Sequence, residues 1–164
     1  MSDDPTRFER LLAQHGGIVG KVARLYARDA DDRRDLAQEI ATQLWRAYPR
    51  FDARLGTFST WMYRIALNVG ISHLRRARSA HALVPLDEGE LAAEAAAEPD
   101  ARTGALYAQI RALEPMARAL VLLYLEDRSY AEIAEVLGIT EANVATKLSR
   151  LKTRLRAQLT GAAS

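Results

Sequence analysis

The chain contains no cysteine, which excludes a disulfide framework, a thiol switch and a thiolate metal site. Its three histidines, His15, His73 and His81, lack the spacing of a metal-binding motif. No phosphate-binding glycine loop or nucleophile triad is present either. We therefore expect a protein that is not an enzyme, with no metal, no cofactor and no small-molecule substrate.

No stretch of the sequence approaches the length of a membrane span, and the N-terminal segment lacks the features of a signal peptide. These absences predict a cytoplasmic protein without membrane insertion. Runs of alternating β-branched residues are also missing, whereas alanine, leucine, arginine and glutamate are abundant. The sequence thus predicts an all-α fold.

The clearest positive signal is a pair of helices joined by a tight turn between residues 129 and 156. Ser129 and Glu132 form a predicted capping box, and Gly138 supplies the permissive backbone on which the first helix ends. The second helix carries an apolar stripe and, from residue 144 to 156, five basic residues without an acidic one. The pattern is typical of a DNA-binding helix-turn-helix, and a helical hairpin with a solvated basic face is the alternative. The stripe comprises Val144, Leu148, Leu151, Leu155 and Leu159.

The formal net charge is only +2, but the charges are unevenly distributed along the chain. Residues 87–100 contain six acidic residues, no basic residue and few large apolar side chains, which is typical of a linker. We therefore predict two small helical domains at residues 1–79 and 102–164, joined by a flexible acidic linker at residues 80–101.

Three helical segments are expected in the first domain. The first is interrupted near Gly16 and Gly17, and the second follows Asp31 and Asp32 and ends at Pro49. The third is predicted to begin at a Ser59 cap and to run into a basic patch around residues 73–78. The second domain should contain a helix before residue 113, another from Pro115 to Leu125, and the helix-turn-helix.

In this order, three segments resemble the extracytoplasmic-function sigma factors, the smallest sigma subunits of bacterial RNA polymerase. RRDLAQEIATQLWRAYPRFD, at residues 33–52, resembles the family's helix for binding core polymerase. GTFSTWMYRIALNVGISHLRR, at residues 56–76, resembles the helix that melts and reads the minus-ten promoter element. LEPMARALVLLYLEDRSYAEIAEVLGIT, at residues 113–140, resembles the domain for the minus-thirty-five element.

The resemblance implies roles for three sets of residues. The loop at residues 51–57 would capture an unstacked promoter base, which aromatic neighbours can stabilise by stacking. Trp61 is expected to be at least partly core, and Arg150 is expected to read guanine. The set implied for core-polymerase binding is Asp35, Leu36, Gln38 and Glu39. The set for the minus-ten element is Phe58, Trp61, Tyr63, Asn68, His73, Arg75 and Arg76, and the set for the minus-thirty-five element is Asn143, Thr146, Lys147, Ser149, Arg150, Lys152 and Arg154.

The implied function is that of a sigma factor, which binds core RNA polymerase and directs initiation at promoter DNA by recognising both elements. The family resemblance further suggests an anti-sigma protein as a partner. Two other interpretations stay open at the level of sequence: a stand-alone helix-turn-helix transcription regulator, and an inactive adaptor that binds polymerase or an anti-sigma protein. A closed form that packs the two domains together and hides both DNA surfaces is a further hypothesis.

Overall fold

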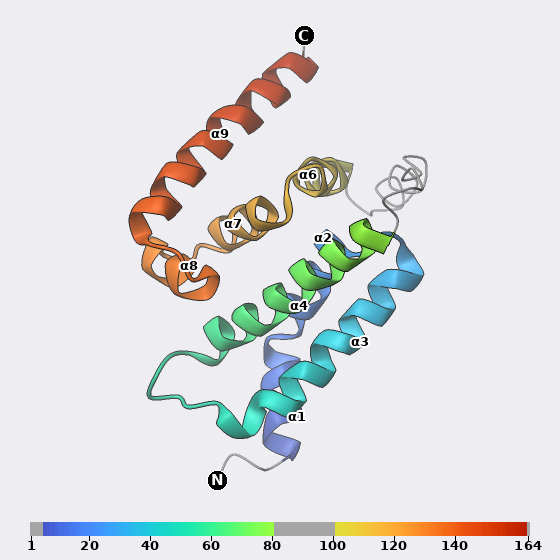
Figure 1. Ribbon diagram of the computed structural model, residues 1–164, viewed down its shortest axis with the longest axis vertical. Coiled ribbons are helices and arrows are strands. Elements are labelled where there is room, and N and C mark those ends of the chain that lie inside the picture. Colours follow the sequence, from blue (N-terminus) through green and yellow to red (C-terminus); the bar gives the residue numbers. More distant parts are fainter. Residues whose placement is uncertain (1–4, 81–100, 164) are drawn as a thin grey trace.

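The structure is a computed structural model that describes residues 5–80 and 101–163 (Figure 1). Every regular element within these two ranges is helical, which confirms the predicted all-α fold. Most of the predicted acidic linker lies outside the described residues. The elements are α1 (Pro5–Gln14), α2 (Gly16–Tyr26), α3 (Ala30–Ala47), the short 3-10 helix η1 (Tyr48–Arg50), α4 (Phe58–Ala80), α6 (Ala101–Arg111), α7 (Pro115–Leu125), α8 (Tyr130–Leu137) and α9 (Glu141–Ala163).

In the N-terminal half, α2, α3 and α4 pack against one another around a continuous apolar core. The predicted break near Gly16 is present, and it falls at His15, between α1 and α2. Gly70 allows α4 to approach α2 closely, because a Cβ atom there would lie 2.9 Å from Cδ2 of Tyr26. The fully buried side chains of this half include Val22, Leu25, Tyr26, Leu36, Ile40, Leu44, Met62 and Leu67.

Two helix starts differ from the sequence predictions. The N-cap of α3 is Asp29, whose side chain accepts a hydrogen bond of 2.8 Å from the Asp32 amide, so the helix begins earlier than expected. For α4, the Ser59 cap was wrong. The Thr57 hydroxyl accepts from the Thr60 amide instead (3.2 Å), and Ser59 lies buried in the first turn.

The C-terminal half contains the predicted helix-turn-helix. Ser129 and Glu132 form the capping box at the start of α8, and Gly138 ends that helix in the left-handed region with a φ of 69°. Val144 and Leu148 of α9 are buried, whereas Lys147 is exposed. The apolar stripe of α9 is thus confirmed at the described side chains.

The two halves pack directly on one another. Helices α7 and α8 contact α4, and α6 contacts α2 (Figure 1). Helix α9 begins at the left of the same view, beside α8, and runs upwards, away from the N-terminal half. This arrangement buries the start of α4 beneath α8 and leaves α9 largely uncovered.

Candidate nucleic-acid and polymerase interfaces

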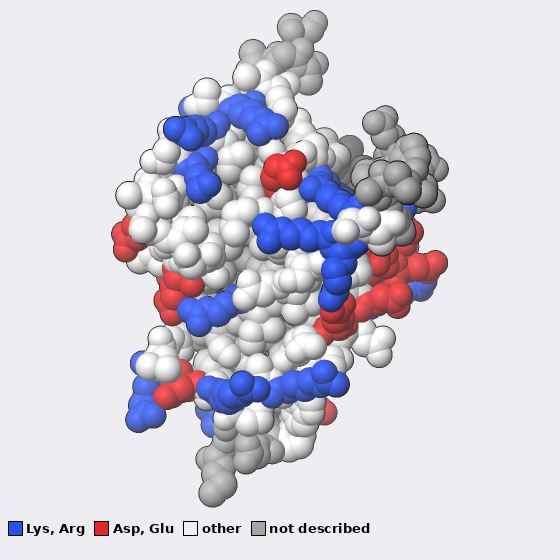
Figure 2. Space-filling view, viewed as in Figure 1, with Lys and Arg blue, Asp and Glu red and all other residues white. Residues whose placement is uncertain are grey.

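The predicted DNA-reading face of α9 lies on the molecular surface. The Thr140 hydroxyl caps the helix by accepting from the Asn143 amide at 3.1 Å. Figure 2 shows positively charged side chains gathered at the upper left of the molecule, where α9 lies. Six of the seven predicted residues are exposed, namely Asn143, Thr146, Lys147, Ser149, Arg150 and Arg154.

The seventh residue of this set, Lys152, is half-buried. Its ammonium lies 4.3 Å from the centre of the Tyr124 ring, in a cation–π contact. A hydrogen bond to Tyr124 raises the pKa of Lys152 above its ordinary value, so the side chain stays charged. The cation is thereby held beside the helix, at the edge of the basic face.

The set predicted for the minus-ten element contains exposed, half-buried and buried members. Asn68, Arg75 and Arg76 are exposed on α4. Phe58 and Tyr63 are buried; only 1% of Tyr63 is exposed, and the Arg128 guanidinium lies 5.1 Å from its ring centre. The expectation that Phe58 and Tyr63 face DNA is therefore wrong for this arrangement of the chain.

His73 is half-buried and faces α3 rather than solvent. Its Nε2 lies 2.9 Å from a carboxylate oxygen of Asp32, and its Nδ1 lies 3.8 Å from Glu39. Arg76 donates to the same Glu39 carboxylate at 3.2 Å. The basic patch of α4 and the predicted polymerase-binding face of α3 thus share one charged network.

The predicted polymerase-binding set on α3 has three surface members and one buried member. Asp35 and Gln38 are exposed, and Glu39 is half-buried. Leu36 is fully buried in the core, so its prediction as a contact residue is corrected: it packs α3 against its neighbours.

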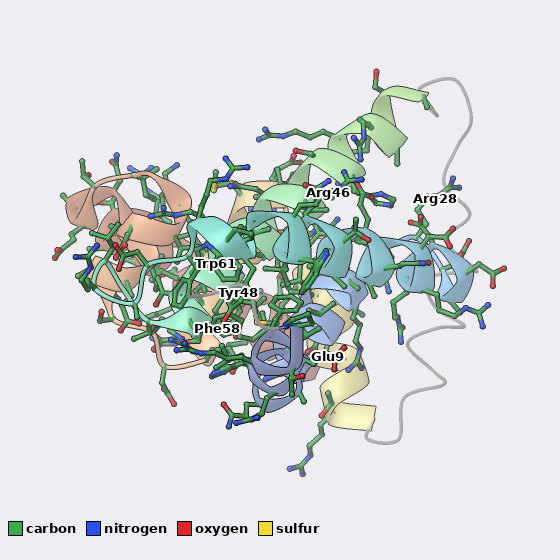
Figure 3. All side chains as sticks on the ribbon, turned by 90° about the horizontal axis from the view of Figure 1, so that it is seen from below. Glu9, Arg28, Arg46, Tyr48, Phe58 and Trp61 are labelled. Atoms are coloured by element: carbon green, nitrogen blue, oxygen red, sulfur yellow. The ribbon has the colours of Figure 1, made fainter. Side chains whose placement is uncertain are left out.

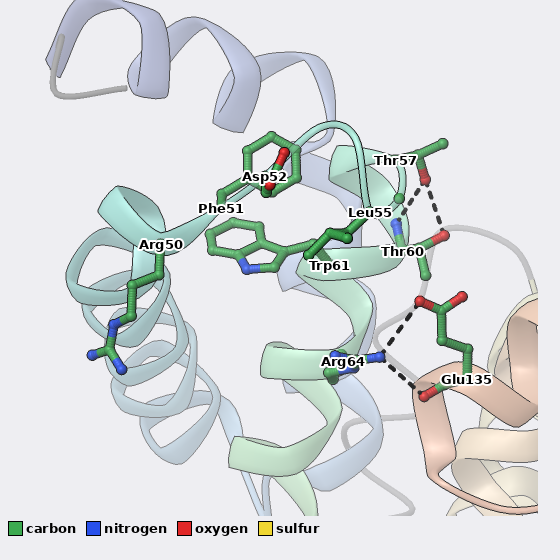
Figure 4. A pocket seen from close by; sticks show the side chains of 10 residues that line it. Arg50, Phe51, Asp52, Leu55, Thr57, Thr60, Trp61, Arg64 and Glu135 are labelled. Atoms are coloured by element: carbon green, nitrogen blue, oxygen red, sulfur yellow. Dashed lines mark hydrogen bonds and ion pairs between the residues drawn. The ribbon is translucent and has the colours of Figure 1, made fainter. Parts of the chain in front are cut away.

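A pocket of about 230 Å³ lies where the loop at residues 51–57 meets the start of α4 (Figure 4). Phe51 and Trp61 form its aromatic side, with ring centres 5.2 Å apart, and Trp61 lies at the same distance from Phe58. Figure 3 shows Phe58 and Trp61 gathered with Tyr48 in one aromatic cluster. Trp61 is half-buried, so it serves both the core and the pocket.

The polar side of this pocket has contributions from both halves of the chain. Arg50 and Arg64 line it from the N-terminal half, and Glu135 of α8 lines it from the C-terminal half. Asp52 accepts hydrogen bonds from the amide and guanidinium of Arg54, and the side-chain bond from Arg54 lowers the pKa of Asp52. An aromatic wall beside two arginines is suited to an unstacked base and its phosphates.

One part of the contact between the halves lies at the C-terminal end of α2. Arg118 is 6% exposed and donates to the carbonyl oxygens of Leu25, at 2.5 Å, and Leu113, at 2.9 Å. Arg111 donates to the Ala27 carbonyl at 2.6 Å. Carbonyls at the end of a helix lack intrahelical partners, so two cations from the C-terminal half cap α2.

Tyr26 completes this contact, because its buried hydroxyl donates to the Pro115 carbonyl at 2.7 Å. Sequence reasoning did not select Tyr26, Arg111, Arg118 or Glu135 as functional residues. Each of these side chains contacts residues far away in the sequence, through a hydrogen bond or in a shared pocket, and no local motif marks such positions.

Burial raises the pKa of Tyr26 well above its ordinary value, which predicts alkaline destabilisation. A group whose folded pKa is raised contributes stability that is fully present below its unfolded pKa, near 10, and is lost as the pH rises further. Above that pH we expect Tyr26 alone to lower the free energy of unfolding by about 1.4 kcal/mol per pH unit. Urea unfolding of Tyr26→Phe, measured from pH 8 to 11, should show a shallower alkaline loss than the unchanged chain, and an identical slope would contradict the assignment.

Over the parts of the chain described here, no helix is long and apolar enough to cross a membrane. The same residues contain no group of three or more histidine, aspartate or glutamate side chains arranged to hold a metal ion.

An exposed basic helix after a tight turn, together with a separate helical bundle, defines a two-part helix-turn-helix DNA-binding protein. Residues 11–80 match Sigma-70 region 2, and residues 103–155 match Sigma-70 region 4. The chain is 29% identical to the ECF RNA polymerase sigma factor SigM of Mycobacterium tuberculosis over 157 residues, covering 94% of this chain and 78% of the relative. It is 30% identical to the ECF RNA polymerase sigma factor SigW of Bacillus subtilis over 139 residues, covering 76% of this chain and 74% of the relative.

A solved structure of CnrH in complex with the cytosolic domain of CnrY is similar to this fold with a TM-score of 0.71 and 25% identity. The similarity covers 98% of this chain and 92% of that one. The chain belongs to the extracytoplasmic-function RNA polymerase sigma factors. As a member of this family, it binds core RNA polymerase and directs promoter-specific transcription initiation.

Proposed function

We propose that the two halves of the chain read the two promoter elements with the surfaces described above. The exposed face of α9 would enter the major groove of the minus-thirty-five element, with Thr146, Ser149 and Arg150 towards base edges. The pocket beside Trp61 would hold an unstacked base of the minus-ten element, and Asn68, Arg75 and Arg76 would contact the strand. The observation that carries this proposal is the aromatic pocket and the exposed basic helix in one chain, on separate halves.

The acidic and amide face of α3 would bind core polymerase through Asp35, Gln38 and Glu39. We propose the domain boundaries at residues 1–79 and 102–164, and the intervening linker, as inferred from the sequence. Catalysis would belong to the polymerase, with no catalytic residue, metal or cofactor in this chain, and the site of action would be the cytoplasm. CnrH, which is similar in structure, was solved with the cytosolic domain of CnrY, and this similarity supports an anti-sigma partner here.

A run-off transcription assay tests this function. Core polymerase with the purified chain should initiate at defined start sites on genomic fragments, whereas core polymerase alone should not. A footprint on duplex DNA without polymerase, and no gain in initiation with it, would instead indicate a stand-alone regulator. An adaptor would bind core polymerase without producing either result.

Arg150→Ala should weaken one promoter element selectively. Loss of a bidentate contact to guanine costs about 1–3 kcal/mol of discrimination. We therefore expect a reduction in initiation that disappears when the minus-thirty-five element is replaced by random sequence. Arg76→Ala is the matched control, since the loss of a phosphate contact should weaken binding on all sequences and reduce its salt dependence. Equal losses for Arg150→Ala on specific and random DNA would remove its base-reading role.

A further inference from the structure

The surface of α4 that forms the wall of the base pocket is also the surface on which α8 packs. Among the contacts between the two halves, those of α8 lie at the pocket itself (Figure 4). The Arg64 guanidinium lies 3.5 Å from the Glu135 carboxylate and donates to the Glu135 carbonyl at 3.4 Å. Glu135 also lines the pocket together with Trp61.

A second group of contacts continues this cover along the first turns of α4. The Arg128 guanidinium donates to the Ser59 hydroxyl at 2.8 Å and lies over the Tyr63 ring. Thr60 donates to the Glu132 carboxylate at 3.5 Å. The polar groups at the start of α4 are therefore occupied by side chains of the C-terminal half.

We propose that α8 acts as an acidic plug on the minus-ten site of the free chain, in which the carboxylates of Glu132 and Glu135 occupy positions that promoter phosphates take when α8 moves away. The proposal rests on the proposed function, and it identifies single-stranded DNA as the competing ligand. Carboxylates and phosphates bind arginine through the same charge-assisted hydrogen bonds, so one can replace the other at Arg64.

The charge state of the plug is consistent with this role. Burial opposes ionisation of Glu132, but hydrogen bonds from the Ser129 amide and hydroxyl and from Arg128 outweigh it, so the pKa of Glu132 lies below its ordinary value. The carboxylate is therefore negative near neutral pH. Glu132 bonds Thr60, which lines the pocket, so its negative charge repels the phosphate backbone of an incoming strand unless the strand displaces it.

The plug affects only one of the two DNA surfaces. The DNA-reading side chains of α9 stay exposed while the start of α4 is covered. The closed form hypothesised from the sequence was expected to hide both surfaces, and the structure corrects this for α9. The free chain would thus keep its minus-thirty-five helix available and expose the minus-ten pocket only after the halves separate.

A cross-link between the halves tests the plug, and the absence of native cysteines makes the chemistry specific. Lys21 and Glu126 form an ion pair of 2.6 Å across the contact, away from the pocket. The double variant Lys21→Cys, Glu126→Cys would be closed with a short bis-maleimide. The matched control is the same variant with each thiol capped by N-ethylmaleimide.

Binding to a fluorescent single-stranded DNA of mixed sequence, measured by anisotropy, should be weaker for the cross-linked chain than for the capped control. In run-off transcription with core polymerase, the cross-linked chain should lose initiation by about tenfold or more, equivalent to about 1.4 kcal/mol. Equal binding and equal initiation by the two forms would overturn the plug. If the unmodified chain gives no promoter-specific initiation, the proposed function fails, and the strand-binding comparison still decides the plug.

A second variant tests the carboxylate directly. Glu135→Gln should raise the affinity for the same single-stranded DNA about two- to fivefold, the range expected when one exposed ion pair is lost. Glu9→Gln, an exposed position on α1, changes the net charge equally and should leave the affinity nearly unchanged. Equal gains for both variants would show a general charge effect and would contradict the plug.

Discussion

Trp61→Ala is expected to reduce initiation from duplex promoters about tenfold to a hundredfold while the chain still binds core polymerase. The Trp61 ring forms one wall of the pocket proposed to hold the base, 5.2 Å from the Phe51 ring. Stacking of one base on an aromatic side chain contributes about 1–3 kcal/mol, and tenfold corresponds to about 1.4 kcal/mol. Run-off transcription would measure initiation, and a separate binding assay would measure the affinity for core polymerase.

The matched variant is Trp61→Phe, which keeps a stacking surface and should retain most of the activity. Because Trp61 also packs on Phe58, thermal unfolding must show that Trp61→Ala remains folded under the assay conditions. Full activity of Trp61→Ala, or a loss of initiation that merely follows a loss of core binding, would remove Trp61 from the capture of the base.

The helix-turn-helix was predictable almost to the residue because its signals are local. A capping box specifies where α8 begins, and a glycine in the left-handed region specifies where it ends. Along α9, the spacing of Val144 and Leu148 identifies the buried side and leaves Lys147 exposed. None of these features depends on residues far away in the sequence.

The helix starts in the N-terminal half were less well predicted because several polar residues compete for each cap. Asp29, Asp31 and Asp32 can all cap a helix, and the structure uses Asp29, with the Asp32 amide as donor. Thr57 and Ser59 compete in the same way at α4. Local propensity places such a boundary within a few residues, and packing then selects among the candidates.

The residues that form the contact between the halves could not be predicted from the sequence. Arg118 bonds the Leu25 carbonyl across 93 residues, and Thr60 bonds Glu132 across 72. Backbone carbonyls have no sequence signature, so an arginine that caps a distant helix looks like any other arginine. For the same reason, Leu36 matched a family contact pattern although its side chain belongs to the core.

Arg118→Ala is expected to lower the free energy of unfolding by about 2–4 kcal/mol and to uncouple the two halves. The substitution leaves the Leu25 and Leu113 carbonyls without their charged donor, and each such bond contributes about 1.5–3 kcal/mol. In the unchanged chain, the stabilisation from these two bonds is partly offset by desolvation of the guanidinium. Burial lowers the pKa of Arg118 to about 10 and so disfavours its charge. We expect the hydrogen bonds to outweigh the cost of burial because two short bonds satisfy the guanidinium.

The distribution of tryptophan allows the uncoupling to be measured. Both tryptophans of the chain, Trp45 and Trp61, lie in the N-terminal half, so their fluorescence reports mainly the unfolding of that half. Circular dichroism reports the helices of both halves. In urea, the two signals should change together for the unchanged chain and at separate midpoints for Arg118→Ala.

The variant's fluorescence midpoint should be the lower one, because α2 loses a cation at its C-terminal end. The fluorescence midpoint of Arg118→Lys should lie between those of Arg118→Ala and the unchanged chain, since an ammonium retains the charge but lacks the planar fork that reaches both carbonyls. Arg156→Ala, at an exposed position of α9, should leave both midpoints unchanged. Coincident and unshifted transitions for Arg118→Ala would show that the halves do not stabilise each other through this side chain.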